Sequence, residues 1–144
     1  MQTAKIFSQP ITNILGVQLS DNPNYLLRLP FRELLTNHVS VMHAAVIYSF
    51  AELSNGFCLN FNFPQYAENT VPLLRKSSAK YRKVVTTDIY SRAEILNESV
   101  EILCERLERK GKIQLQIEVK LYDQEEDEVF RGLFDWFVTL NKDR

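Results

Sequence analysis

Glu52 is the only charged residue between His43 and Leu53, in a segment (residues 41–53) that is otherwise apolar on nearly every side. Because a buried carboxylate is costly unless it is paired, hydrogen-bonded or protonated, its presence there needs a reason. In a partly dry site, a carboxylate can act as a general base toward water or as a nucleophile. The alternative is that Glu52 reaches a helix end and pairs with a nearby Lys or Arg.

A second group of residues precedes Glu52: Asn37, His43, Ala44 and Ala45. If a helix begins near Ala44, its first N–H groups lack partners within the helix and can stabilise an oxyanion that develops on a carbonyl. The Asn37 amide and the His43 imidazole could orient that carbonyl or the attacking water. The alternatives are plain helix packing for the alanines, and a capping or core hydrogen bond for His43.

A helix buried on all sides is the expected setting for Glu52, because residues 41–53 show no clean polar face. Ser40 is the expected N-cap, since its hydroxyl can accept an N–H of the first turn. Gly56 is the expected C-terminal stop. The rest of the chain must then wrap around this helix.

The spacing of these residues resembles a known signature. His43-Ala44-Ala45 begins six positions after Asn37, and Glu52 follows nine positions after the His. This is similar to the Asn-x-x-Gly-x-x-His-Gly-Gly…Asp signature of PaaI-type acyl-CoA thioesterases, which have the hotdog fold. Here Ala-Ala replaces the Gly-Gly pair, and Glu52 replaces the Asp.

The resemblance spans about residues 17–140, because residues 75–83 and 111–140 are similar to the hotdog group typified by the YiiD C-terminal domain. It implies hydrolysis of acyl-CoA or another acyl thioester by a homodimer or a dimer of dimers, with active sites between protomers. Glu52 would activate water, and the amides near Ala44 would polarise the carbonyl. The chain has no Gly-rich phosphate loop, G-x-S-x-G elbow or metal-ligand cluster, so neither a cofactor nor a metal is expected.

Two other functions stay open. A non-catalytic acyl-binding, acyl-CoA-binding or regulatory hotdog domain fits the departures from the signature, because Ala44 can cover the N–H that a Gly would expose. Hydroxyacyl dehydration is the weaker alternative. His38 lies fourteen positions before Glu52, which resembles the His/Glu dyad of hotdog β-hydroxyacyl dehydratases, but the Pro and Gly that this family has between them are missing.

Basic residues gather in one segment: Arg75, Lys76, Lys80, Arg82 and Lys83. Phosphates of coenzyme A, or the phosphopantetheine arm of an acyl carrier protein, would suit these side chains, because Arg and Lys pair strongly with phosphate. The alternative is that they are the solvated cations of an edge strand. Ser77 and Ser78 lie in the part that resembles the substrate-facing strand of the family, where either could hydrogen-bond a water.

The whole chain indicates a single domain over residues 1–144, because its length is usual for one domain and 45% of it is hydrophobic. The net charge of −1 disfavours nucleic-acid binding. No apolar run approaches the roughly 18 residues of a membrane span, and residues 1–10 lack the apolar core of a signal peptide. Cys58 and Cys104 form no C-x-x-C pair, so a reducing, cytoplasmic setting is expected.

Alternating apolar and polar residues predict the strands around the helix, at residues 17–20, 25–29, 57–63, 85–96, 113–121 and 129–140. Helices are expected at residues 10–15 and 98–110, the second capped by Asn97 and ended by Gly111. The expected class is α+β: a hotdog fold in which an antiparallel sheet wraps a central buried helix. Trp136 and its neighbouring phenylalanines exceed what one sheet face needs, which favours an oligomeric contact.

Overall fold

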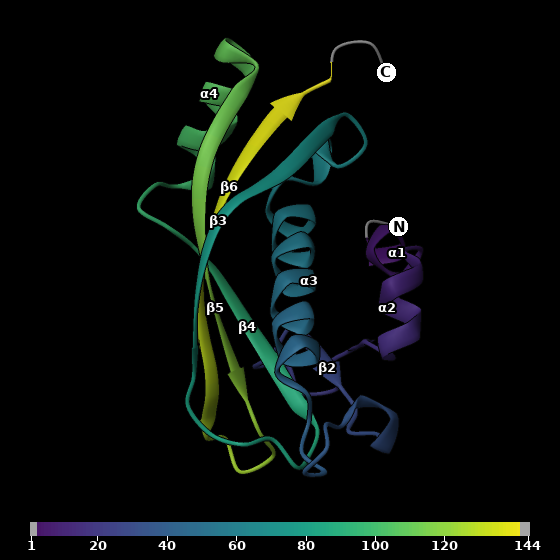
Figure 1. The fold of residues 1–144 in the computed structure, drawn as a ribbon. Coiled ribbons are helices and arrows are strands. Elements are labelled where there is room, and N and C mark those ends of the chain that lie inside the picture. The colour runs from purple at the N-terminus through teal and green to yellow at the C-terminus, as the bar shows by residue number, and fades with distance from the viewer. Residues whose placement is uncertain (1–2, 142–144) are drawn as a thin grey trace.

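The computed structural model describes residues 3–141, which form a six-stranded sheet along one side of a long helix, α3 (Ala44–Asn62) (Figure 1). The strand order is β1-β2-β4-β5-β6-β3, and every neighbouring pair is antiparallel. The strands are β1 (Gln18–Leu19), β2 (Leu27–Leu29), β3 (Thr70–Tyr81), β4 (Ile89–Leu96), β5 (Lys112–Tyr122) and β6 (Glu128–Leu140). This arrangement confirms the expected α+β class.

Shorter helices complete the fold: α1 (Thr3–Phe7), α2 (Pro10–Leu15), α4 (Val100–Lys110) and the 3-10 turns η1 (Glu33–Leu35) and η2 (Pro64–Tyr66). Figure 1 shows α1 and α2 on the side of α3 that faces away from the sheet. No helix among residues 3–141 is long and apolar enough to cross a membrane.

The core lies between α3 and the sheet. Alternate residues of β5 are fully buried, among them Ile117, Val119 and Leu121, because a strand presents every second side chain to the same face. Phe130 and Phe134 of β6 are also fully buried. The intervening residues of both strands lie on the outer face of the sheet, away from α3.

The central helix is displaced toward the C-terminus from the sequence prediction. His43 is its N-cap, and Ser40 instead sits in a turn with a φ of 62°. The helix continues through Gly56, so residues 57–63 are helical up to Asn62 and the predicted strand there is wrong. The alternation did not reflect one buried strand face, because Phe57 is buried by helix packing whereas Phe61 is 69% exposed.

The other predicted elements are mostly confirmed, with shifted ends. The segment 10–15 is α2, and residues 113–121 and 129–140 lie within β5 and β6. Helix α4 ends at Gly111, whose φ is 73°, as predicted, but its N-cap is Ser99 and not Asn97. The strand predicted for residues 85–96 begins at Ile89, and β3 forms where no regular pattern was visible.

Trp136 does not indicate an oligomeric contact. Its ring is only 6% exposed, and its Nε1–H donates to Asn55 Oδ1 at 3.1 Å, inside the core. Asn55 in turn donates from Nδ2 to the Ala51 carbonyl of its own helix at 2.9 Å. The aromatic residues of β6 are therefore largely explained by the long helix that they cover.

Candidate active site

Glu52 is the ninth residue of α3 and is half-buried. Burial raises the pKa of its carboxyl group above the ordinary value, because the charged form loses solvation. No hydrogen bond or ion pair to Glu52 is found among residues 3–141. The structure thus gives no support to the alternative that this carboxylate only pairs with a Lys or Arg.

Helical periodicity places Glu52 on one stripe of α3 with Ala45, Tyr48 and Gly56, because residues three, four and seven apart share a face. Strand β3 runs beside this stripe. The Tyr48 and Ser77 hydroxyls are 2.7 Å apart and share a hydrogen bond. Nearer the helix start, the Tyr81 hydroxyl donates to the Ala44 carbonyl at 3.3 Å. Glu52 therefore faces the side of the helix that borders the outermost strand of the sheet.

The start of α3 offers one free amide. His43 Nδ1 accepts the Ala45 N–H at 3.0 Å, so this N–H is already used by the cap. The Ala44 N–H has no hydrogen-bond partner within the described part of the chain. All three residues are exposed. Since the helix dipole is positive at this end, the Ala44 N–H is suited to a developing negative charge.

Asn37 supports the loop before α3. Its Oδ1 accepts the N–H groups of Val39 at 3.0 Å and Val41 at 3.3 Å, and its own N–H donates to the Val41 carbonyl. These bonds close a tight turn that sets the direction in which the chain enters the helix. The side-chain oxygen of Asn37 is thus committed to the loop.

Glu52 and the Ala44 N–H lie well apart along α3 within one protomer. They are eight residues apart on one continuous helix, which at about 1.5 Å per residue is ~12 Å. Reacting and stabilising groups must lie within about 3–3.5 Å of the reacting atoms. Helix α3 alone therefore does not bring the two backbone positions together.

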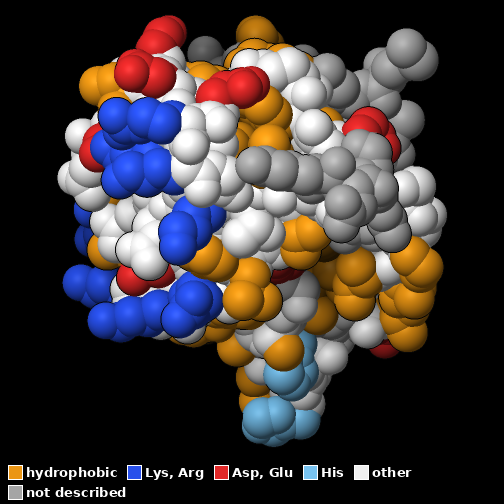
Figure 2. Space-filling model, turned by 90° about the horizontal axis from the view of Figure 1, so that it is seen from above, with side chains coloured by type: hydrophobic (Ala, Val, Ile, Leu, Met, Phe, Trp, Pro, Cys, Tyr) orange, Lys and Arg blue, Asp and Glu red, His pale blue; other side chains and the backbone are white. Residues whose placement is uncertain are grey.

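The basic segment begins on β3, mostly on the outer face of the sheet, and continues beyond the end of the strand at Arg82 and Lys83. Strand register places Lys76, Ser78 and Lys80 opposite the outward residues of β6, while Ser77 points toward α3. Arg75 lies at a β-bulge with its guanidinium 5.6 Å from the centre of the Phe137 ring. Figure 2 shows the Lys and Arg side chains gathered on one side of the molecule, beside a hollow bordered by hydrophobic side chains.

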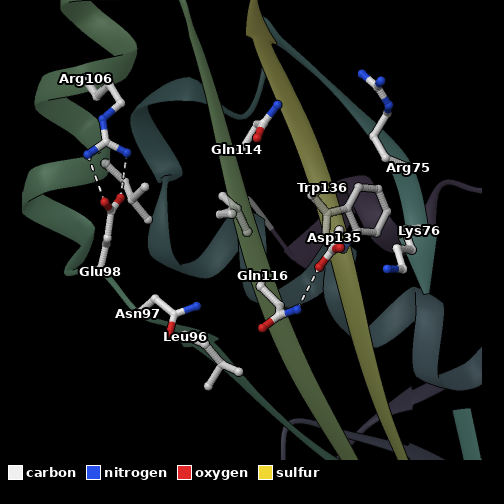
Figure 3. Close-up of a pocket in the computed structure, with 12 residues that line it drawn as sticks. Arg75, Lys76, Leu96, Asn97, Glu98, Arg106, Gln114, Gln116, Asp135 and Trp136 are labelled. Atoms are coloured by element: carbon white, nitrogen blue, oxygen red, sulfur yellow. Dashed lines mark hydrogen bonds and ion pairs between the residues drawn. The ribbon is translucent and has the colours of Figure 1, made fainter. Parts of the chain in front are cut away.

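Arg82 is already paired, since its Nη1 lies 2.7 Å from Glu128 Oε2. Arg75 and Lys76 instead border an outer-face hollow of about 550 Å³. In Figure 3 they lie on one side of it, and the Arg106–Glu98 ion pair, at 2.6 Å, lies on the other. No ion pair engages Arg75 or Lys76 among the described residues.

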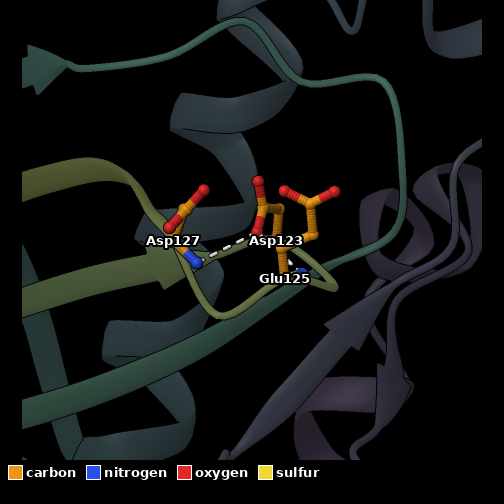
Figure 4. Close-up of side chains that lie close together, drawn as sticks. All are labelled: Asp123, Glu125 and Asp127. Atoms are coloured by element: carbon orange, nitrogen blue, oxygen red, sulfur yellow. Dashed lines mark hydrogen bonds between the residues drawn. The ribbon is translucent and has the colours of Figure 1, made fainter.

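Three carboxylates, Asp123, Glu125 and Asp127, come together in the turn between β5 and β6 (Figure 4). Lys83 Nζ lies 2.9 Å from both Asp123 and Asp127. Burial alone would raise the pKa of Asp123, but the Lys83 ammonium and the Asp127 and Glu125 N–H groups lower it below the ordinary value. Because Lys83 already supplies the positive charge, this cluster fixes the turn and offers no evidence of a metal site.

Tyr48 and Tyr81 are site residues that the sequence pattern does not reveal. Their hydroxyls join β3 to α3, a contact between segments about 30 residues apart in the chain. The only sequence signal is the position of Tyr48, one helical turn before Glu52.

Comparisons with known proteins identify the family and the fold. A family model described as a domain of unknown function, DUF4442, matches residues 13–138. No curated protein matches the chain significantly.

Solved structures match nearly the whole chain at low identity. A Pseudomonas aeruginosa protein of unknown function, described as a probable thioesterase, is 21% identical with a TM-score of 0.77, covering 92% of this chain and 89% of its own. A Bacillus halodurans protein solved with CoA is 16% identical with a TM-score of 0.71, covering 95% and 80%. The PaaI protein of the E. coli phenylacetic acid degradation operon is 10% identical with a TM-score of 0.65, covering 96% and 88%.

The central helix, the antiparallel sheet and these structural matches agree with the expected architecture. The chain has the hotdog fold and belongs to the DUF4442 family.

Proposed function

We propose that this chain forms a homodimer that hydrolyses acyl-CoA or another acyl thioester. The observation that carries the proposal is Glu52, a half-buried carboxylate without a partner among the described residues, on the face of the central helix beside β3. A carboxylate with a raised pKa in such a setting is suited to general-base catalysis. The descriptions of the relatives, one as a probable thioesterase and one as solved with CoA, support the same chemistry.

The second protomer would pair through β3. This strand has 12 residues and is the last strand of the sheet, so one of its edges has no neighbour within the described chain. Long unpaired edges are templates for another strand, and an identical strand can pair through a two-fold axis. The homodimer would then contain one continuous sheet.

A two-fold axis through the middle of β3 would complete the site. Ser77 lies near that middle and is hydrogen-bonded to Tyr48 of α3. Ala44 and Glu52 lie four residues before and four residues after Tyr48. Because the axis makes the two central helices antiparallel, Glu52 of one protomer would come level with the Ala44 N–H of its partner. The two groups would then come from different helices, so the ~12 Å that separates them along one helix would no longer keep them apart.

In the proposed reaction, the Glu52 carboxylate accepts a proton from water as the water oxygen attacks the thioester carbonyl carbon. The Ala44 N–H of the other protomer donates to the carbonyl oxygen as it becomes an oxyanion. The oxyanion then collapses, the carbon–sulfur bond breaks, and the proton held by Glu52 passes to the leaving thiolate. The products are the carboxylic acid and the free thiol of the carrier.

The remaining predicted residues have supporting roles in this proposal. His43 and Asn37 fix the start of α3, and Ser77 fixes β3 against Tyr48. On the outer face, Arg75, Lys76 and Lys80 are available for the carrier phosphates, with Ser78 between the two lysines. Arg82 is the weaker candidate, because Glu128 already pairs with it.

A non-catalytic acyl-binding domain is the second candidate. The specific observation in its favour is the His43 cap, which engages the Ala45 N–H and leaves a single amide donor at the helix start. A protein of this kind would bind acyl-CoA and release it unchanged.

Steady-state hydrolysis of a panel of acyl-CoA thioesters separates these functions. We expect turnover by the wild type and a fall in kcat of about 10²–10⁴-fold in Glu52→Gln, because that variant keeps the shape of the side chain but cannot accept the proton. Glu105→Gln, at an exposed position of α4, is the matched control and should retain full activity. Binding of acyl-CoA without turnover by the wild type would support the second candidate instead.

A further inference from the structure

A second cavity lies beyond Glu52, at the C-terminal end of α3. Its volume is about 120 Å³, and it lies between α3, α4, the start of β3 and the inner face of β5 and β6, with the exposed Lys5, Gln9 and Pro72 also lining it. The side chains around it are mainly apolar: Leu59, Phe63, Leu107, Ile113, Leu115 and Val138. Each of these six is less than 9% exposed, so this part of the cavity wall belongs to the buried core.

Three polar side chains at this cavity have partners, whereas the Gln9 and Asn60 amides have none among the described residues. The Tyr66 hydroxyl donates to Glu108, and the Thr70 hydroxyl donates to the Tyr66 carbonyl at 2.7 Å. Lys5 Nζ donates to the Ala67 carbonyl. Because these groups already have partners, the cavity suits an apolar guest better than water or an ion.

Gly56 lies between this cavity and Glu52 along α3. It lines the cavity and follows Glu52 by one helical turn on the same stripe of α3. An added Cβ at this position would make an ordinary van der Waals contact with Ile6 Cδ1, at 3.9 Å, and would meet no closer atom. Gly56 lies inside a helix, where Gly is less favourable than Ala. The missing side chain thus keeps this wall of the cavity low on the side toward the proposed base.

We propose that the cavity receives the far end of the acyl chain and sets a limit on its length. This inference rests on the proposed thioester hydrolysis at Glu52. An apolar cavity of about 150 Å³ holds a benzene-sized guest, so 120 Å³ holds roughly four carbons. About four more carbons span the single helical turn of ~5.4 Å between Glu52 and Gly56. The preferred substrates are therefore medium-chain acyl thioesters, with about eight carbons.

Filling the cavity tests this inference. Gly56→Leu adds about four carbons at the cavity wall and favours the helix. We measure kcat/KM for saturated acyl-CoA thioesters of increasing length. The wild type should prefer octanoyl-CoA. In Gly56→Leu, we expect kcat/KM for octanoyl-CoA to fall at least tenfold while that for butyryl-CoA changes less than threefold. Gly56→Ala is the matched control, because it makes the same backbone change but occupies little of the cavity.

Val138→Ile provides a second test from the opposite wall, on β6 and off the catalytic helix. It should also lower the ratio of kcat/KM for octanoyl-CoA to kcat/KM for butyryl-CoA, by a smaller factor than Gly56→Leu does. An unchanged chain-length profile in both variants would overturn the inference while leaving thioester hydrolysis intact.

Calorimetric titration with octanoate separates this failure from a failure of the proposed function. If the wild type hydrolyses no acyl-CoA, binding of octanoate that is lost in Gly56→Leu still supports an acyl site in the cavity. Equal binding of octanoate by both proteins, or binding by neither, would contradict it.

Discussion

The Ala44 N–H can be removed without disturbing the helix that carries it. Ala44 is the first residue of α3, a position where Pro is favourable because its missing N–H has no partner in the helix. The preceding residue must be extended, and His43 has a ψ of 137°. Ala44→Pro therefore deletes the one amide proposed to stabilise the oxyanion and leaves the cap at Ala45 in place.

The expected effect on catalysis is large, and the expected effect on stability is small. Loss of one oxyanion donor lowers kcat by about 10²–10³-fold, or ~2.7–4 kcal/mol of transition-state stabilisation. Pro at a compatible position changes the free energy of unfolding by about 0.4–1 kcal/mol in the stabilising direction. The two effects are thus separable in one variant.

Steady-state hydrolysis of acyl-CoA and urea denaturation measure these two quantities. Ala44→Gly is the matched control, because it keeps the N–H, and it should retain most of the activity. A folded Ala44→Pro variant with wild-type kcat would refute the role of this amide. Equal losses of kcat in the Pro and Gly variants would instead assign the effect to the side chain.

Three further predictions concern the base, the dimer and the core. The raised pKa of Glu52 should place the acid limb of the kcat/KM profile above pH 4.5, the ordinary value, and Glu52→Gln should lack that limb. Because the folded state holds this proton more tightly, ionisation of Glu52 lowers the stability of the protein as pH rises through the raised pKa. At pH 7, the urea midpoint of Glu52→Gln should therefore be no lower than that of the wild type. With the native cysteines replaced by serine, Ser78→Cys should form an intermolecular disulfide near the two-fold axis, and Val71→Cys should not, as shown by non-reducing electrophoresis. Asn55→Ala should lower the free energy of unfolding by about 1–3 kcal/mol in urea, because Trp136 Nε1–H loses its buried acceptor.

The sequence predicts those features that depend on local pattern. The alternation along β5 gives its length and its buried face, because one side packs on α3 and the other meets solvent. Gly111 marks the end of α4, because it adopts a left-handed conformation. The sequence also places Glu52 on the central helix, although it sets the N-cap at Ser40 and not at His43.

The features that sequence could not give depend on contacts between distant segments. Residues 57–63 alternate like a strand, yet residues 57–62 continue α3, because Phe57 and Leu59 are buried by the packing of this helix. The Tyr48–Ser77 contact, which fixes β3 beside the helix, has no local pattern at all. The ~12 Å between Ala44 and Glu52 follows only from the observed helix bounds.

Mixing two inactive variants tests most directly whether the site is shared between protomers. Ala44→Pro and Glu52→Gln are unfolded together in urea, refolded so that subunits exchange, and assayed for acyl-CoA hydrolysis. In a mixed dimer, the Ala44→Pro chain supplies an intact Glu52 opposite the intact Ala44 amide of its partner. Half of the dimers are mixed and half of their sites are intact, so about a quarter of wild-type activity should return. Activity no higher than the sum of the two separate variants would contradict a site built from Glu52 of one protomer and Ala44 of the other.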